Sequence, residues 1–225
     1  MRMSFWEILS VGYFPQEIFK VHFWLSLLGL CILGYLLGSL NFAVIISKLF
    51  FHEDIRNQGS KNAGLTNMLR VYGKTAAIFT LIGDVFKTVI ACMIGRVIFG
   101  DTGAAVAGLG CILGHAFPIY YHFKGGKGVL ATAAMALCLN PFAFGLLIAF
   151  FIAIVAVTKY VSLGSVMGAL LFPIVLSKTS EPNMFSTIVS VIAAILIVIL
   201  HRANIKRILD GTESKIDFKS KKKKT

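Results

Sequence analysis

The chain has 225 residues, of which 57% are apolar and 14% charged, and its mean hydropathy is +0.82. Soluble domains are about 45–50% apolar and about 25% charged, so this composition excludes a soluble fold of this size. The net charge of +12 would suit nucleic acid in a soluble protein, but here the cations stand in short connections and at the C-terminus. They indicate membrane topology and contact with membrane lipids, and no nucleic-acid partner is expected.

The chain divides into three regions. Residues 1–22 lack a compact basic-then-apolar signal, which predicts an interfacial helix or a loose lead-in. Residues 23–202 hold all the long apolar stretches and predict a single membrane domain without a separate soluble module. Residues 203–225 predict a cytoplasmic juxtamembrane helix followed by a polybasic tail, Lys219–Thr225.

A membrane-spanning helix needs about 20 mostly apolar residues. The candidate stretches, in chain order, are Phe23–Phe50, Ala76–Phe99, Gly103–Tyr121, Val129–Val157, Val161–Leu176 and Phe185–Leu200. The second contains Asp84 and Lys87, and the third is rich in glycine, which is typical of close helix packing. Asn140-Pro141 interrupts the fourth, and proline breaks a helix at about the residue before it.

The basic connections decide how often the chain crosses the membrane. Residues 51–74, residues 122–127 and the segment after His201 are basic, and the positive-inside rule puts such connections in the cytoplasm. All three lie inside if the N-terminus is outside and the fourth stretch turns back at Asn140-Pro141. The sequence therefore predicts an all-α, polytopic integral membrane protein of about seven transmembrane helices, two of them short.

Polar, glycine-rich sequence concentrates on the predicted cytoplasmic side. Its first part is Ser39, placed within the first helix, followed by Asp54–Lys74. Arg56 offers a forked cation that suits phosphate. Amide and hydroxyl groups follow at Asn62, Thr66 and Asn67. A solvated loop with Asx turns would look similar, so this part alone is a weak signal for phosphate.

The second part contains Gly125, Gly126, Lys127 and Gly128 directly before an apolar helical run. Free amides at a helix start can bind an anion, helped here by the lysine. A flexible connection is the alternative, and the spacing of an ATP-binding Walker loop is absent. His115, near the membrane edge, fits a hydrogen-bonded packing residue better than a catalyst.

The third part is His201–Lys215. His201 and Asn204 are three residues apart and share a helix face, Gly211 is placed to end that helix, and Glu213 follows. On spacing alone, an amphipathic juxtamembrane helix that touches lipid headgroups explains this part best.

Taken together, these parts resemble the PlsY family, the acyl-phosphate:glycerol-3-phosphate acyltransferases, from about Gly34 to Lys215. The motifs occur in the order GYLLGS, DIR..GS.N.G.TN...R..GK, G...D..K, GH.FP....FKGGKG, YVSLGS and HR.NI.R...G.E.K. The resemblance implies an enzyme of the bacterial inner membrane that transfers a fatty acyl group from acyl phosphate to glycerol 3-phosphate. The products are lysophosphatidic acid and phosphate, in the first step of phospholipid synthesis.

The resemblance also implies which residues form the site. The catalytic residues it implies are Ser39, Arg56, Lys127, His201 and Asn204. The substrate-binding residues expected beside them are Asn62, Thr66, Asn67, Gly125, Gly126 and Gly128, and Glu213 matches a structural glutamate. The chain departs from many relatives at Asn41, where they have proline, and at Lys61, Ala63 and Leu65 in GSKNAGLTN. These departures bear on loop geometry, not on the reaction.

An acyl phosphate is a mixed anhydride with a good leaving group, so no covalent nucleophile, metal or cofactor is expected. The four cysteines lie in apolar segments without CxxC spacing. A transporter of a small phosphorylated solute is the main alternative, but transporter sites usually lie near the midplane, often in repeats. A packing subunit is a further alternative, which leaves the glycine-lysine motifs unused. A monomer is the expected state.

Overall fold

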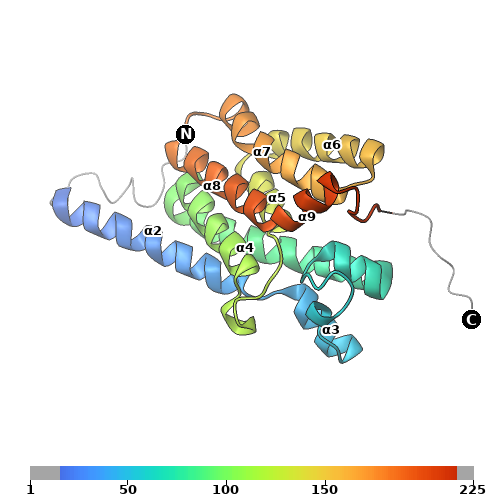
Figure 1. Ribbon diagram of the computed structural model, residues 1–225. Helices are drawn as coiled ribbons and strands as arrows, with labels where there is room; N and C mark the ends of the chain where they lie inside the picture. Colours follow the sequence, from blue (N-terminus) through green and yellow to red (C-terminus); the bar gives the residue numbers. More distant parts are fainter. Residues whose placement is uncertain (1–15, 217–225) are drawn as a thin grey trace, which may run out of the picture.

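A computed structural model describes residues 16–216 of the chain, and within that range it contains helices and no strand, as the sequence predicted (Figure 1). The helices are α2 (Gln16–Gly38), α3 (Phe42–Phe51), α4 (Leu65–Ala116), α5 (Val129–Leu139), α6 (Pro141–Thr158), α7 (Val161–Thr179), α8 (Met184–Leu200) and α9 (Arg202–Leu209). Two short 3-10 turns, Ile55–Asn57 and Ile119–Tyr121, lie in the connections. Residues 1–15 of the predicted lead-in and 217–225, with the polybasic tail, lie outside the described residues.

The predicted first helix, Phe23–Phe50, is wrong at its centre, because α2 ends at Gly38 and α3 begins at Phe42. Ser39 therefore lies in a break between two helices and not inside one. Asn41 causes the new start: its Oδ1 accepts a hydrogen bond from the amide of Val44 (3.2 Å), as an N-cap side chain does. Hydropathy alone does not detect this break, because the residues on both sides of it are apolar.

The next two predicted helices, Ala76–Phe99 and Gly103–Tyr121, are the two arms of α4, which folds back on itself. Phe99 and Gly100 have non-helical backbone angles, and a Cβ on Gly95 would overlap the backbone of Gly103 on the other arm. The first arm begins close to the predicted Ala76, after the non-helical Gly73, but a further helical stretch precedes it and the second arm ends earlier than predicted. The helix begins at Leu65, with a non-helical residue at Gly73, and it ends at Ala116 rather than Tyr121.

Close backbone contact joins α2 to the second arm of α4. A Cβ added to Gly34 or Gly38 would overlap the carbonyl oxygens of Ala107 or Cys111, and one added to Gly114 would overlap that of Tyr35. Glycines four residues apart let helix backbones approach closely, which stabilises helix pairs in lipid, where there is little hydrophobic drive between them. The glycine-rich composition of the third stretch therefore has the packing role that was predicted for it.

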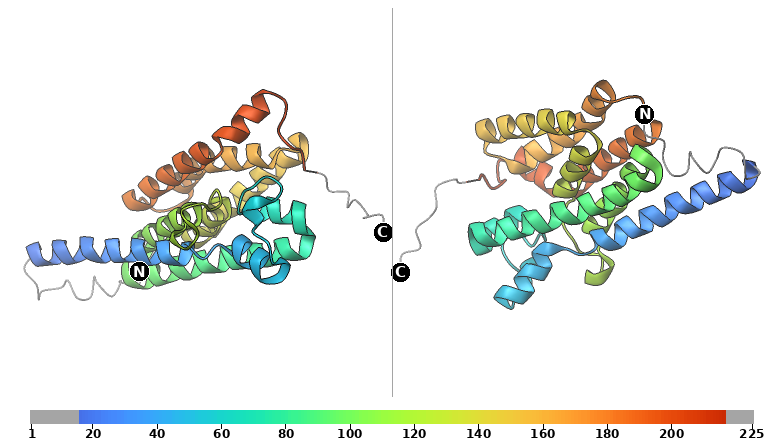
Figure 2. Two further views of the ribbon diagram at one scale, coloured as in Figure 1. Left: turned by 60° about the horizontal axis from the view of Figure 1, so that its bottom comes forward. Right: turned by 180° about the vertical axis from the view of Figure 1, so that it is seen from behind.

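The predicted break at Asn140-Pro141 is confirmed. Asn140 caps α6 by accepting hydrogen bonds from the amides of Phe142 (2.9 Å) and Ala143 (3.0 Å), and Pro141 takes the first helical position, where its missing N–H costs nothing. The short helix α5 lies in the middle of the molecule, in contact with α4, α6, α7 and α8 (Figures 1 and 2). Its buried Ala131 and Met135 belong to the main apolar core.

The number of membrane crossings stays a prediction. Among the described residues, four helical stretches are long and apolar enough to cross a membrane, or five if α8 and α9, which meet at a bend of 56°, form one crossing. The two arms of α4 are counted together in this number, and α5 is shorter than the limit. Only 11% of the residues of α6 are buried in the molecule, which suits a helix that faces lipid.

The glycine contact between α2 and α4 gives a test of the packing. Gly34→Ala should lower the unfolding temperature of the purified protein in detergent, because an overpacked contact costs about 1–3 kcal/mol. Gly29→Ala is the matched control: it lies in the same helix, but a Cβ there meets nothing within 4 Å. Equal unfolding temperatures for the two variants would contradict the close approach of α2 and α4.

Candidate functional site

The site is built on residues 117–128, here called the connecting segment, which joins α4 to α5. This segment contains the turn Ile119–Tyr121 and the glycine-lysine motif. Side chains from the loop before α4, from the break after α2 and from α9 all contact it. The segment therefore brings the three polar parts of the sequence to one end of the helix bundle.

Arg56 holds the middle of the connecting segment. Its guanidinium pairs with Asp54 through two hydrogen bonds (Nε to Oδ1, 2.9 Å; Nη2 to Oδ2, 2.6 Å). Its Nη1 donates to the carbonyl oxygens of Tyr121 (2.8 Å) and Lys124 (3.2 Å). Hydrogen bonds from Arg56 lower the pKa of Asp54 to about 2, so the pair is ionised at neutral pH. Four of the five N–H groups of Arg56 thus have protein acceptors.

Ser39 ties the end of α2 to the start of the connecting segment. Its buried Oγ donates to the carbonyl oxygen of Tyr35 (2.8 Å) and accepts from the amide of Ile119 (3.4 Å). The Tyr35 hydroxyl donates to the carbonyl oxygen of Phe117 (2.8 Å) beside it. Ser39 is fully buried, so its hydroxyl meets protein atoms in this structure.

Asn67 organises the loop before α4. Its Oδ1 accepts from the amide of Ser60 (2.9 Å), and its Nδ2 donates to the carbonyl oxygens of Ile55, Gln58 and Asn62 at 3.0–3.2 Å. Asn67 is buried, with 1% of its surface exposed, and its hydrogen-bonding groups are used within the loop. Its position in the structure is that of a residue that shapes the loop.

The other predicted loop ligands differ from Asn67. Thr66 is exposed and Asn62 is half-buried, and the side chain of neither forms a hydrogen bond with a residue of the described part of the chain. Asn41 connects this loop to the break after α2, because its Nδ2 donates to the carbonyl oxygen of Ala63 (3.3 Å). The residue that stands in place of proline therefore has a structural role at both ends of its side chain.

The first two glycines of the motif pack against the end of α4. The amides of Gly125 and Gly126 donate to carbonyl oxygens there (3.2 and 3.0 Å), and a Cβ on either would overlap atoms of His115. These two amides are already used, whereas the amides of Lys127 and Gly128 have no acceptor among residues 16–216. Any anion at the start of α5 would meet the later amides rather than the earlier ones.

Lys127 reaches across to α9. Its Nζ donates to Oδ1 of Asn204, whose Nδ2 donates to Oε1 of Glu213 (2.6 Å). Glu213 also accepts from Ser162 Oγ on α7 (2.7 Å) and from Arg207 Nε (2.7 Å). Glu213 therefore fixes α9 against α7 and orients the amide that faces the lysine. Within the described part of the chain, Asn204 is the one acceptor of the Lys127 ammonium, which has three donors.

His201 stands next to this group, directly after α8. Its Nδ1 lies 2.8 Å from the carbonyl oxygen of Ile197, so Nδ1 carries the hydrogen and Nε2 is the basic nitrogen. Nε2 has no hydrogen-bond partner among residues 16–216. Burial and the nearby charge of Lys127 lower the pKa of His201 to about 4, so the ring is neutral at neutral pH.

Burial shifts the pKa values of Lys127 and Glu213 in opposite directions. Burial lowers the pKa of Lys127 to about 8, against the attraction of Glu213. Burial alone would raise the pKa of Glu213, but hydrogen bonds from Asn204, Ser162 and Arg207 outweigh it and lower that pKa. Near neutral pH the site thus holds a carboxylate with satisfied hydrogen bonds and an ammonium that is costly to keep charged.

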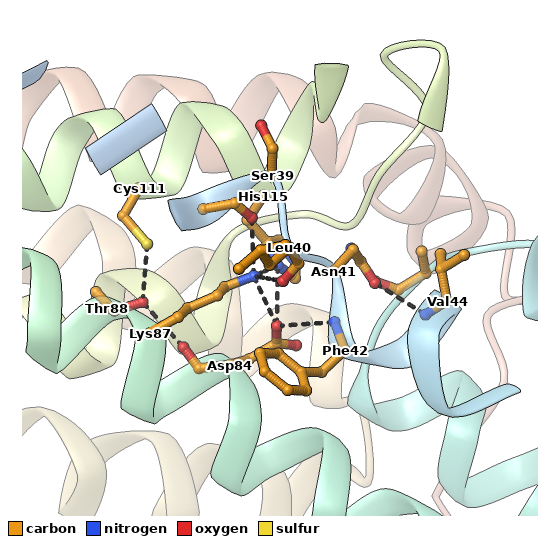
Figure 3. A network of polar contacts seen from close by, with 12 residues as sticks. Ser39, Leu40, Asn41, Phe42, Val44, Asp84, Lys87, Thr88, Cys111 and His115 are labelled. Carbon is orange, nitrogen blue, oxygen red and sulfur yellow. Dashed lines mark hydrogen bonds and ion pairs between the residues drawn. The ribbon is translucent and has the colours of Figure 1, made fainter. Parts of the chain in front are cut away.

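Sequence reasoning missed a buried polar cluster beneath the break after α2 (Figure 3). Lys87 lies 2.7 Å from Asp84 and 3.2 Å from Nδ1 of His115, all three buried. The two charges inside an apolar stretch were visible in the sequence, and such residues are functional candidates by default. Ser162 was also missed, since nothing in the sequence connects it to Glu213, 51 residues away.

Ser39, Arg56, Lys127 and Asn204 are connected through residues 117–128 at one end of an all-helical, largely apolar bundle. A half-buried lysine with spare donors, free backbone amides and a neutral histidine lie together there. No group of three or more His, Cys, Asp or Glu side chains gathers as metal ligands would within residues 16–216. The fold and the site together define an all-helical membrane protein with a cationic, partly buried polar site at one end of its bundle.

The comparisons with known proteins identify the family. The model of the family described as glycerol-3-phosphate acyltransferase matches residues 28–211. A glycerol-3-phosphate acyltransferase of Finegoldia magna is 38% identical over 193 residues, covering 86% of this chain and 98% of that protein. Glycerol-3-phosphate acyltransferase 2 of Bacillus anthracis is 42% identical over 188 residues, covering 82% and 96%.

Solved structures agree with this match. The crystal structure of PlsY, an integral membrane glycerol 3-phosphate acyltransferase, in its glycerol 3-phosphate form has a TM-score of 0.80 and 32% identity, covering 85% of this chain and 96% of that one. Its lysophosphatidic acid form has a TM-score of 0.78 and 30% identity, with the same coverage. This chain belongs to the glycerol-3-phosphate acyltransferase family, and it is an integral membrane protein.

The pKa values of Lys127 and His201 predict how activity depends on pH. The ammonium of Lys127 must be protonated to bind an anion, so kcat/KM should fall as pH rises through about 8. His201 stays neutral down to about pH 4 and so adds no acidic limb near neutrality. Lys127→Arg should move the basic limb upward because arginine keeps its charge, and Lys124→Arg, at an exposed position, is the control. A basic limb unchanged in Lys127→Arg would assign it to another group.

Proposed function

We propose that this acyltransferase takes its acyl group from an acyl phosphate and transfers it to glycerol 3-phosphate, giving lysophosphatidic acid and phosphate. The observation that carries the proposal is the ammonium of Lys127, half-buried and held by Asn204, with donors to spare beside the basic nitrogen of His201. The relatives and the PlsY structures named above carry glycerol 3-phosphate and lysophosphatidic acid in their descriptions, which supports the same acceptor and product here.

In the reaction, a hydroxyl oxygen of glycerol 3-phosphate forms a bond to the acyl carbonyl carbon, and the bond from that carbon to the phosphate oxygen breaks. The phosphate leaves with the bonding electron pair. The hydroxyl proton goes to Nε2 of His201, which is free and neutral, or to a substrate phosphate. The main task of the protein is to hold two anions close together in line.

The anions would be held by the free donors of the site. Lys127 and the amides of Lys127 and Gly128 would bind phosphate at the start of α5. Asn204 would accept or donate a hydrogen bond to glycerol 3-phosphate next to the lysine. Ser39 would exchange its hydrogen bond to Tyr35 for one to the substrate. Thr66 and Asn62, whose side chains form no hydrogen bond within residues 16–216, are the loop residues that can add contacts.

A structural role, rather than direct binding of the substrates, is proposed for Arg56, Asn67, Gly125 and Gly126. Their donors are used to fix the loop and the connecting segment. Arg56 has one remaining N–H group. Its main contribution to substrate binding would therefore be to fix the backbone of the connecting segment, which contains Lys127. Its loss would displace that backbone and leave Asp54 with Lys48, at 3.6 Å, as its remaining ion-pair partner.

We further propose the N-terminus-outside orientation, with the site facing the cytoplasm of a bacterial inner membrane. Residues 23–202 would act as a single membrane domain and as a monomer, and residues 203–225 as a cytoplasmic extension. The acyl chain of the donor would lie among membrane lipids and reach the site between helices. A transporter of a phosphorylated solute, the alternative from sequence, has no support in the comparisons, which match acyltransferases.

An assay with two donors tests the reaction. Purified protein in detergent, given labelled glycerol 3-phosphate and palmitoyl phosphate, should form labelled lysophosphatidic acid, whereas palmitoyl-CoA should give none. A transporter makes no product because it needs two compartments. Equal product from palmitoyl-CoA would overturn the assignment of the donor while leaving the acyltransferase activity in place.

Substitutions separate the two cationic residues. Lys127→Ala should lower kcat/KM for glycerol 3-phosphate by at least about 100-fold, since it removes a charge-assisted contact worth about 2–3 kcal/mol or more. Arg56→Ala should also abolish most activity, but with a lower unfolding temperature, because the clamp on the connecting segment is lost. Lys124→Ala, an exposed lysine in the same segment, is the control and should stay within about twofold of the unsubstituted protein. Near-normal turnover in Lys127→Ala would remove that residue from the site.

A further inference from the structure

The mechanism above makes no use of the buried cluster of Asp84, Lys87 and His115. Lys87 is 3% exposed and the Asp84 side chain 1%, so both charges are held away from water. Such a pair is costly to bury, and replacing it with apolar residues is often neutral or even stabilising. A buried pair of this kind is therefore weak evidence for stability, and its contacts indicate what else it does.

Lys87 contacts the backbone on both sides of Ser39. Its Nζ donates to the carbonyl oxygen of Gly38 (2.9 Å) and to that of Leu40 (2.8 Å), in addition to Asp84. These two carbonyl groups lose their helical partners where α2 ends, so the lysine satisfies groups that the break leaves open. Figure 3 shows the ammonium directly under the break.

Asp84 contacts the opposite end of the same break. Its Oδ1 accepts a hydrogen bond from the amide of Phe42, the first residue of α3, at 3.5 Å. Its other oxygen, Oδ2, is buried without a partner in the described part of the chain. The ion pair on α4 thus holds the last residue of α2, the break at Leu40 and the first residue of α3.

His115 extends the cluster to the glycine-lysine motif. Its Nδ1 lies 3.2 Å from Nζ of Lys87 and 3.5 Å from Oδ1 of Asp84. Nε2 packs so closely on Gly126 that a Cβ there would overlap it, and the amide of Gly126 donates to the His115 carbonyl oxygen (3.0 Å). The residue after Gly126 is Lys127.

We propose that Asp84, Lys87 and His115 form a positioning unit that sets Ser39 on one side and Lys127 on the other at the spacing that glycerol 3-phosphate requires. This inference rests on the proposed function. The unit acts through backbone groups and does not touch the substrate. Its loss should therefore weaken binding of glycerol 3-phosphate, which lies between the two positions, more than binding of the acyl phosphate.

A single and a double substitution separate positioning from simple stability. Lys87→Met leaves a buried carboxylate without its partner and should lower the unfolding temperature clearly. Asp84→Asn/Lys87→Met removes both charges and should restore much of that stability. The carbonyl groups of Gly38 and Leu40 still lack their donor in the double variant, so its KM for glycerol 3-phosphate should stay raised by about tenfold, with KM for palmitoyl phosphate within about twofold.

Thr88→Val is the matched control, because Thr88 is buried on the same helix and bonds the carbonyl oxygen of Asp84 without touching the break. It should leave both KM values unchanged. If the double variant regains stability and keeps an unchanged KM for glycerol 3-phosphate, the cluster contributes only an ion pair to the fold, and the proposal is overturned. Absence of acyl transfer in the unsubstituted protein would instead overturn the proposed function.

His115 supplies an independent test if the Lys87 variants do not fold. His115→Asn keeps an acceptor near the position of Nδ1, and His115→Ala keeps none. The alanine variant should raise KM for glycerol 3-phosphate by about tenfold, and the asparagine variant should recover part of that loss. Equal KM values in both variants and in the unsubstituted protein would overturn the proposal.

Discussion

The architecture of the site depends on one stretch of backbone held from two sides. Arg56 binds the carbonyl groups of Tyr121 and Lys124 in the middle of the connecting segment, and Asn204 binds the side chain of Lys127 near its end. The two holding residues are far apart in the chain and lie on different parts of the bundle. The packing of the helices thus fixes the backbone of residues 117–128 and, through it, the position of the Lys127 ammonium.

That arrangement is possible because the helices around it pack through small residues. Glycines let α2 approach the second arm of α4 at backbone distance, which places Ser39 and Tyr35 where they can reach the start of the connecting segment. In lipid, polar groups at a helix break need partners within the protein, since no water is available to them. Lys87, Asn41 and Asn67 each satisfy several such groups.

The sequence predicted the all-helical membrane class and the break at Asn140-Pro141, because hydropathy and proline chemistry act locally. It missed the break after Gly38, since the apolar count continues through it and the decisive partner, Lys87, is 47 residues from Leu40. It placed Lys127, His201 and Asn204 in the site through a family resemblance, and the structure brings these three together.

Residue type alone could not show which donors are free. Arg56 and the first two glycines of the motif suit phosphate by composition, but their hydrogen bonds go to protein acceptors that lie elsewhere in the chain. Lys127 also suits phosphate by composition, but Asn204 is the one acceptor of its ammonium within residues 16–216 and leaves two of its three donors unused. The distinction depends on tertiary contacts, and no spacing in the sequence records it.

The central claim is that the loop before α4, the connecting segment and α9 share one side of the membrane. Single cysteines at the exposed positions Ser60, Lys124 and Lys206, in a background without native cysteines, can be labelled with a membrane-impermeant maleimide. All three should be protected in intact cells and should react after the membrane is opened. Labelling of one position from the opposite side to the other two would leave the site without a common location.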